Sequence, residues 1–358
     1  MAIVLTRNAD GSVGVVDRTD SLQVIPNTVG ITNALGLFQN DPRSQKNVEI
    51  TRTTRRNSLL EDRNWDERNQ TIAGREADSL LLKIPHFPAD DAISPNDIDG
   101  VVAAGSLAET AELESVASVR AEKMIDLREA HGLTLEAARM QLITEGTVYA
   151  PRSTVSTNYY TEFGITREEV GLTLAAATDP RTGVNEAKKA VRAGLTGGQA
   201  GTVRAFVALC SDSFYNALIQ NAYVTDALKY VDQGQALNIL LGNGGSAVNG
   251  LDARFESVTL FGITWINAGA AGYEDNEGEF VPFVPEGDAY LLPVGVRNMF
   301  KTYYAPANRF SSVNRQAQMS YWFEYMNQKD DIIEIMTEQN FLNACLAPGA
   351  IVRLFLDT

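Results

Sequence analysis

The sequence DAYLLPVGVRNMFKTYYAP occupies residues 288–306. Its apolar run from Ala289 to Leu292 predicts a buried strand. A second strand is expected from Met299 to Pro306, a run rich in aromatic residues, and the residues between the two runs predict a turn. The stretch therefore predicts two consecutive strands late in the chain.

From about residue 180 onward the pattern predicts alternating helices and strands. The chain closes on short apolar runs separated by polar or Pro-Gly turns. A tight acidic turn is expected over Asn276–Gly278. The other expected elements are a helix over Asn185–Leu195, a strand over Val203–Cys210, a helix capped by Ser211 or Asp212, and strands over Val258–Ile266, Tyr321–Met326, Ile332–Met336 and Ile351–Leu356.

A long helix is predicted in the first half of the chain. It starts at Ser106, where Glu109 completes a capping box, and apolar residues then follow at spacings of three and four from Leu113 to Leu127. The dipeptide His131-Gly132 predicts the end of this helix or a kink in it.

A second helical run is expected directly after this dipeptide. It begins at Thr134, continues to Ile143 and is closed by Gly146. Val148 and Tyr149 should then start a strand. Together the two runs predict a long, mostly solvated helical rod.

Residues 1–85 contain two segments that cannot form a core of their own. The first 40 residues are polar and rich in turns, with a hairpin turn expected at Asp10-Gly11, and they predict an arm that lies on another surface. Short strands around Val48 and Leu82 then enclose more than 20 mostly polar residues, which predicts a long hairpin or loop projecting from the body.

Charge is distributed unevenly between this loop and the segment after it. The whole chain carries −15, yet residues 42–75 hold eight basic and five acidic residues, while residues 84–119 hold seven carboxylates and no lysine or arginine. A cationic loop on an acidic protein favours docking onto an acidic surface, including that of another copy; a solvated loop with internal salt bridges is the alternative. The predicted interface residues are Arg52, Arg55, Arg56, Arg63, Trp65 and Arg68 in the loop, and Asp90, Asp91, Glu109, Glu112 and Glu114 in the acidic segment.

Composition narrows the class of protein. With 358 residues, 44% of them hydrophobic, the chain is long enough to bury a sizeable core. Its negative charge disfavours nonspecific binding to nucleic acid or to an anionic membrane. Cys210 and Cys345 stand alone, which excludes a disulfide scaffold and a thiolate zinc site. Neither a signal peptide nor a membrane span is expected, so the default is a reduced, cytoplasmic folding environment.

Catalytic chemistry is not indicated by any motif. His86 lies between prolines, and His131 is expected at a helix C-terminus, where its charge would suit the helix dipole. The glycine-rich run at 242–246 lacks the GK[ST] ending of a phosphate loop, and the acidic cluster at 274–279 lacks the ligand spacing of an EF-hand. We therefore expect no catalytic residues, no cofactor and no metal site.

The order of these pieces resembles the Hong Kong 97-type capsid fold of tailed bacteriophages, and at sequence level the phage lambda major capsid protein E family. Two runs carry the resemblance, Asp288–Pro293 and Met299–Pro306, with Asn298 in place of a family glycine. The tail from Phe341 to Val352 and the strands that bound the loop are similar as well. The resemblance implies an α+β fold with an N-terminal arm (1–41), an extended loop (42–95), a spine helix with the first part of a peripheral domain (96–180), an axial domain (181–312) and return strands of the peripheral domain (313–358).

The resemblance also implies a function. A major capsid protein would self-assemble, as hexamers and pentamers, into an icosahedral shell around the double-stranded DNA of a tailed phage, without sequence-specific DNA binding and without a membrane. Portal, scaffolding and decoration proteins would be its partners, and it would reside in the virion after assembly in the host cytoplasm. A non-viral compartment shell of the same fold and a carboxylate-dependent enzyme are the alternatives.

Overall fold

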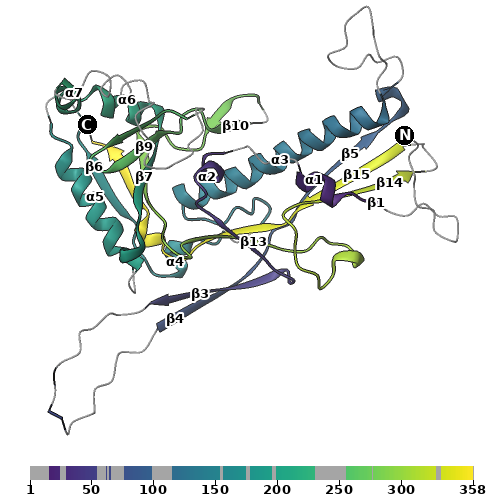
Figure 1. The fold of residues 1–358 in the computed structure, drawn as a ribbon, viewed down its shortest axis with the longest axis horizontal. Coiled ribbons are helices and arrows are strands. Elements are labelled where there is room, and N and C mark those ends of the chain that lie inside the picture. Colours follow the sequence, from purple (N-terminus) through teal and green to yellow (C-terminus); the bar gives the residue numbers. More distant parts are fainter. Residues whose placement is uncertain are drawn as a thin grey trace, which may run out of the picture.

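The computed structural model describes residues 16–24, 30–54, 62, 64–65, 76–98, 115–153, 156–174, 178–195, 199–229, 255–275, 277–327 and 332–357. The expected turn at Asp10-Gly11, the capping pair Ser106 and Glu109, and the glycine-rich run at 242–246 lie outside these residues. The molecule is elongated, with a sheet and its helices at one end, a long helix through the middle and a second sheet at the other end (Figure 1).

A six-stranded sheet forms one end of the molecule, in the order β6-β17-β12-β7-β9-β8. Its central strands are almost entirely buried because their apolar runs have no polar face. Helix α5 contacts β6, β12 and β17, whereas α6 contacts β9. The elements are β6 (Glu168–Leu172), α5 (Arg181–Ala193), β7 (Ala205–Cys210), α6 (Asp212–Gln220), α7 (Ala222–Lys229), β8 (Ser257–Leu260), β9 (Ile263–Asn267), β12 (Asp288–Val294) and β17 (Val352–Leu356).

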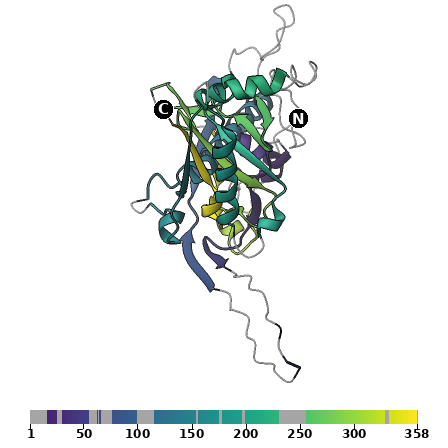
Figure 2. The same cartoon turned by 90° about the vertical axis from the view of Figure 1, so that its left-hand side faces the viewer.

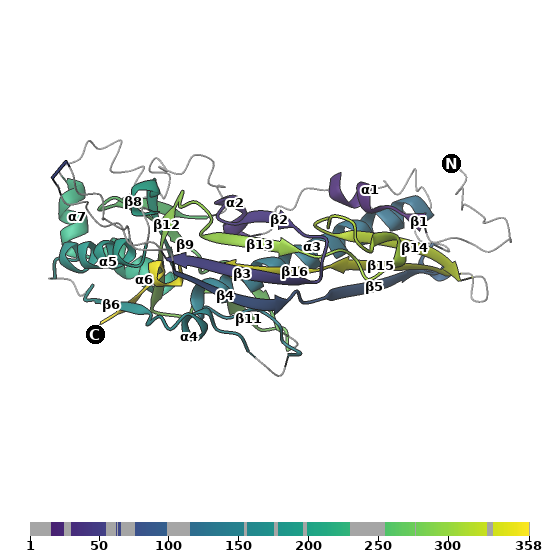
Figure 3. The same cartoon turned by 90° about the horizontal axis from the view of Figure 1, so that it is seen from below.

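The stretch 288–306 forms the link from this sheet to the rest of the molecule. It contributes β12 and then β13 (Phe300–Tyr304), as its pattern predicts. Strand β13 pairs antiparallel with β16 (Phe341–Cys345) and parallel with β2 (Gln39–Pro42). Segments from near both ends of the chain therefore lie side by side here (Figure 3).

Helix α3 (Val116–Thr144) is one continuous helix of 29 residues. A helix that runs unbroken from Ser106 is wrong, because Ser115 has an extended backbone and caps α3 through the amide of Ser118. The end or kink expected at His131-Gly132 is also wrong. Both residues are buried against the sheets, and this packing outweighs the cost of about 1 kcal/mol that a glycine imposes inside a helix.

A four-stranded antiparallel sheet forms the other end, in the order β1-β14-β15-β5. Helix α3 packs on it through a small core that includes Met124, Trp322 and Ile335. The arm also joins this core, since α1 (Thr19–Val24) buries Leu22 completely. The strands are β1 (Val16–Asp17), β5 (Phe87–Ile93), β14 (Tyr321–Asn327) and β15 (Ile332–Gln339).

Two expectations for strands are wrong. Residues 258–266 form a hairpin of β8 and β9, because Phe261 and Gly262 turn the chain with φ of 54° and 72°. Val148 and Tyr149 form no strand; the neighbouring Thr147 makes only an isolated bridge to Asn158. The remaining described elements are α2 (Ile31–Ala34), β3 (Asn47–Thr54), β4 (Glu76–Lys83), α4 (Tyr159–Glu162), β10 (Gly272–Glu274) and β11 (Phe280–Pro282). Asn276 of the acidic turn expected over Asn276–Gly278 lies outside the described residues, and the Gly278 amide, between β10 and β11, donates to the Asp275 carbonyl.

Candidate functional site: the projecting hairpin and its anchors

Strands β3 and β4 form an antiparallel hairpin that leaves the body of the molecule, as predicted (Figures 1 and 2). Its base is amphipathic. Val48 faces Leu82 and Ile50 faces Leu80 on the side that packs into the main core, whereas Glu49 and Leu81 face solvent. Because successive side chains of a strand point to opposite faces, the apolar residues of one face fasten the hairpin base to the body, and the other face, which carries Leu81, is left exposed.

The predicted interface residues of the hairpin differ in whether their own chain already contacts them. Arg52 lies opposite Asp78, and its guanidinium lies 5.6 Å from the ring centroid of Phe163, so it is engaged by its own chain at the base. Trp65, in contrast, is fully exposed. The other predicted arginines, Arg55, Arg56, Arg63 and Arg68, lie outside the described residues.

The predicted acidic residues also differ in whether they are already paired within the chain. Asp90 is exposed on β5. Asp91 is half-buried, and Lys123 of α3 donates to both of its carboxylate oxygens at 3.0 and 2.9 Å, so this carboxylate serves to hold β5 against the helix. Glu109, Glu112 and Glu114 lie outside the described residues. Of the two acidic candidates that the structure describes, Asp90 is therefore the one whose side chain is exposed to solvent.

The surface on which the described part of the N-terminal arm lies belongs to the same chain, so burial of that part needs no neighbouring copy. The buried carboxylate of Glu324 on β14 accepts from Arg18 at 3.0 Å and from the indole of Trp322 at 2.8 Å, and it lies 2.9 Å from Arg120 of α3. Two cations and one indole therefore offset the cost of burying this charge. The N-terminal arm, the four-stranded sheet and helix α3 are therefore all joined at the carboxylate of Glu324.

A second anchor holds the arm at α2. The carboxylate of Glu136 on α3 accepts from the Thr32 amide at 2.8 Å and from the Thr32 hydroxyl. Burial raises the pKa of Glu136 above its usual value. Gly30, with φ of 97°, leaves the space that this side chain occupies, because a Cβ there would overlap the Glu136 carboxyl. We did not predict this contact, since a glycine and a glutamate 106 positions apart carry no shared local pattern.

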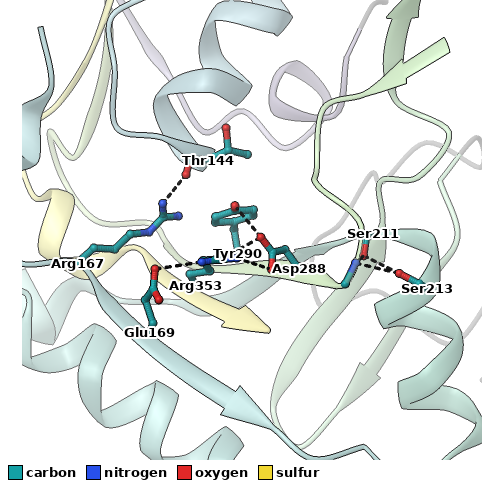
Figure 4. A network of polar contacts seen from close by, with 9 residues as sticks. Thr144, Arg167, Glu169, Ser211, Ser213, Asp288, Tyr290 and Arg353 are labelled. Atoms are coloured by element: carbon teal, nitrogen blue, oxygen red, sulfur yellow. Dashed lines mark hydrogen bonds and ion pairs between the residues drawn. The ribbon is translucent and has the colours of Figure 1, made fainter. Parts of the chain in front are cut away.

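Polar contacts join strands of the six-stranded sheet to one another (Figure 4). Arg353 on β17 donates to both oxygens of Asp288 on β12 at 2.9 and 3.0 Å and to Glu169 on β6 at 3.2 Å. These bonds raise the pKa of Arg353, because they stabilise its charged form. Nearby, the Gly287 amide donates to the hydroxyls of Ser211 and Ser213. The network holds strands together and places no histidine beside either serine.

Both histidines have structural partners. The Thr337 hydroxyl donates to the Ala89 carbonyl at 2.7 Å and therefore accepts from Nε2 of His131, 2.9 Å away. His131 lies inside α3 instead of at the predicted C-terminus, and burial, with Arg128 one turn away, lowers its pKa to about 4. His86 Nδ1 lies 2.7 Å from the side-chain oxygen of Asn340.

The cysteines, the grouping of possible metal ligands and the described helices bear on other kinds of function. Cys210 and Cys345 are buried, and burial raises the pKa of both thiols, that of Cys345 to about 12. Among the described residues, no three histidine, cysteine or carboxylate side chains gather as a metal site would need. None of the described helices has an apolar run long enough to cross a bilayer.

Comparisons of the sequence with known proteins find a matching family and similar proteins. The family model for phage major capsid protein E matches residues 15–356. The major capsid protein of Pseudomonas phage KPP10 is 35% identical over 350 residues, which cover 94% of this chain and 95% of the relative. The major capsid protein of Salmonella phage Felix O1 is 24% identical over 377 residues, covering 99% of each chain.

Solved structures show the same fold at low sequence identity. A prophage protein of Escherichia coli CFT073, described as a capsid protein, has a TM-score of 0.58 at 11% identity, with 96% of this chain and 100% of that chain covered. The mature capsid of bacteriophage PhiM1 gives a TM-score of 0.51 at 11% identity, with 92% and 88% covered.

Proposed function

Because this chain belongs to the phage major capsid protein E family, we propose that its copies assemble into the closed icosahedral shell that encloses the double-stranded DNA of a tailed phage. The protein is a phage head shell protein with the Hong Kong 97-type capsid fold. The observation that carries the proposal is the family match over residues 15–356, which includes the arm from residue 15 onward, the hairpin, the long helix and the return strands.

The shape of the chain supports assembly through projecting elements. The hairpin is fastened to the core by one face of its base only, and it presents Trp65 to solvent. An extended element with a cationic composition gains contacts when it lies on an acidic neighbour. We propose that Arg55, Arg56, Arg63 and Arg68 dock on a neighbouring copy, with Asp90, Glu109, Glu112 and Glu114 as the first acidic candidates. Arginine suits this role because its planar guanidinium pairs bidentately with carboxylates.

The domain organisation follows the same proposal. The arm covers 1–41 and the extended loop 42–95, while the spine helix and the first part of the peripheral domain fill 96–180. The axial domain takes 181–312 and the return strands 313–358. Strands β7, β8, β9 and β12 of the six-stranded sheet, with α5, α6 and α7, fall in 181–312 and support the axial range, although β6 and β17 join that sheet from outside it. Helix α3 packs with β14 and β15, which supports the peripheral ranges, although β1 and β5 of the four-stranded sheet come from the ranges given to the arm and the loop.

Hexamers and pentamers of this chain would form the shell, with portal, scaffolding and decoration proteins as partners. The net charge of −15 disfavours adhesion of packaged DNA to the shell, so the genome would be enclosed without sequence-specific binding. Assembly in the host cytoplasm and residence in the virion follow from this role, which requires no catalytic step. The two histidines support a structural role, since each is engaged by a side chain of its own fold.

Electron microscopy and sedimentation of the purified protein test the proposal. We expect closed shells of uniform size, formed by the chain alone or after co-expression with a scaffolding protein from the same genome. Monomers or dimers as the only species at every salt concentration, pH and scaffold condition would contradict it.

A further inference from the structure

The segment between β13 and β14 presents apolar side chains to solvent. Phe310 is 102% exposed, and Val313 and Met319 in the same segment are exposed as well. Single exposed apolar residues are common on protein surfaces, but three within ten residues form a patch of the kind that marks an interaction site. Figure 1 shows this segment leaving the body below α3.

The patch is held in place from both ends. The guanidinium of Arg309 lies 4.4 Å from the ring centroid of Phe323, and the Asn308 amide donates to Glu338 at 2.9 Å. Further along, the Gln318 amide donates to the Tyr321 hydroxyl at 2.8 Å. Little conformational entropy remains to be lost when such a segment docks, so an exposed aromatic residue on it is suited to act as an anchor.

A pocket of about 280 Å³ lies beside the patch, at the base of the hairpin. Pro306, Ala307 and Val313 supply apolar lining, and Asn314 and the residues from 44 to 47 complete the wall. Lys46, in that wall, donates to Asn308 at 2.6 Å, which joins the hairpin base to the segment that carries Phe310. The pocket therefore lies at the base of the hairpin that is proposed to contact a neighbouring copy.

We propose that Phe310 of one copy inserts into this pocket on a second copy of the chain. The inference rests on the proposed self-assembly and deepens it by naming an apolar contact that is separate from the hairpin arginines. A second copy is the occupant because each chain carries both the aromatic side chain and the pocket, so repetition of one contact around a closed shell can fill the pocket of each copy. Pro306, Ala307 and Val313 give the pocket an apolar part that a phenyl ring can contact, and its position at the hairpin base adjoins the element already proposed to contact a neighbouring copy.

The first test compares two serine variants. Phe310→Ser should raise the protein concentration needed for shell formation by about tenfold or more, because a well-packed aromatic anchor is removed. Phe280→Ser is the matched control, since Phe280 is 53% exposed on β11, away from this segment. Circular dichroism of both variants should match that of the wild type. Equal assembly of Phe310→Ser and wild type would overturn the proposal.

The second test identifies the occupant. A tagged Phe310→Cys chain is co-assembled with an untagged Asn47→Cys chain under oxidising conditions, and shells are analysed on a non-reducing gel. The native cysteines are buried and stay out of the reaction. A disulfide-linked pair of one tagged and one untagged chain supports the proposal, since it can form only between copies. Shells that lack this pair, or that show only tagged–tagged pairs, overturn it, whatever the serine variant does.

The two proposals fail in distinguishable ways. If wild-type protein forms shells but no tagged–untagged pair appears, only the Phe310 contact is wrong. If wild-type protein forms no shells under any condition, the proposed function itself fails and the contact falls with it.

Discussion

The guanidinium of Arg167 donates a hydrogen bond to the backbone carbonyl of Thr144, the last residue of α3. Its Cζ atom also lies 5.7 Å from the ring centroid of Tyr160 and 4.9 Å from that of Tyr290 on β12. A cation at a helix C-terminus satisfies an orphan carbonyl and interacts favourably with the helix dipole. One side chain thus joins the end of the long helix to the six-stranded sheet (Figure 4).

Replacement of this arginine should destabilise the fold. We expect Arg167→Met to lower the free energy of unfolding by about 2–3 kcal/mol, because a charge-assisted hydrogen bond and two cation–π contacts are lost. Arg152→Met, at an exposed position, should change it by less than about 0.5 kcal/mol. Urea denaturation of unassembled protein measures both. Equal values for the two variants would show that the contact with Thr144 contributes nothing.

The departure from the family pattern at Asn298 has a conformational basis. Asn298 has φ of 58°, in the left-handed region that glycine adopts without strain and that asparagine tolerates better than other residues. Asn298→Gly should therefore change the free energy of unfolding by less than about 1 kcal/mol, whereas Asn298→Val should lower it by about 1–2 kcal/mol. Denaturation of the two variants side by side gives the comparison, and a valine variant as stable as the glycine variant would refute the explanation.

The buried imidazole of His131 should make stability fall in acid. Its pKa is about 4 in the fold and about 6.5 when unfolded, so folding favours the neutral form. The contribution is complete above pH 6.5 and is lost as the pH falls through 4, which amounts to about 3 kcal/mol between pH 7 and pH 4. His131→Gln should remove this part of the acid dependence of unfolding, whereas His86→Gln, at an exposed position, should retain it. An unchanged pH profile in His131→Gln would rule out the buried imidazole as its source.

Reversal of charge in the hairpin should affect assembly and leave the fold intact. Arg55→Glu combined with Arg56→Glu should abolish or misdirect shell formation. Each exposed pair contributes only about 0–1 kcal/mol, but the contacts recur in every copy of a shell. The control, Arg152→Glu with Lys189→Glu, makes the same change in net charge at exposed positions on the body. Circular dichroism reports the fold and sedimentation the assembly. Normal shells from the hairpin variant would falsify the docking role, and loss of helix signal would place these arginines inside the fold.

Local patterns predicted most elements of the fold. Ser211 caps α6 by accepting from the amide of Phe214, as the sequence suggested, and alternation at Val48 and Leu82 predicted the hairpin base. The errors came where tertiary packing outweighed a local signal. Gly132 is a helix breaker by propensity alone, yet it lies in the middle of α3. Phe261, an apolar residue within an apolar run, turns the chain between β8 and β9.

The proposed interface was predicted less completely than the fold. Its charge asymmetry is visible in composition, but the roles of individual residues are not. Arg52 and Asp91 are both charged residues at plausible positions, and each is engaged within its own chain, by Phe163 and Lys123. Composition cannot distinguish a charge that faces a neighbour from one that is already paired, because pairing depends on the positions of distant segments.

The sequence by itself determined the succession of an arm, a projecting hairpin, a long helix and alternating strands, since these depend on contacts between residues close in the chain. Only the tertiary structure decided how distant segments meet: β2 beside β13, Glu136 against Gly30 and Arg353 on Asp288. Such pairs are selected by shape, burial and charge after the elements have formed. A buried carboxylate or guanidinium must find a partner, and the fold as a whole determines which one lies within reach.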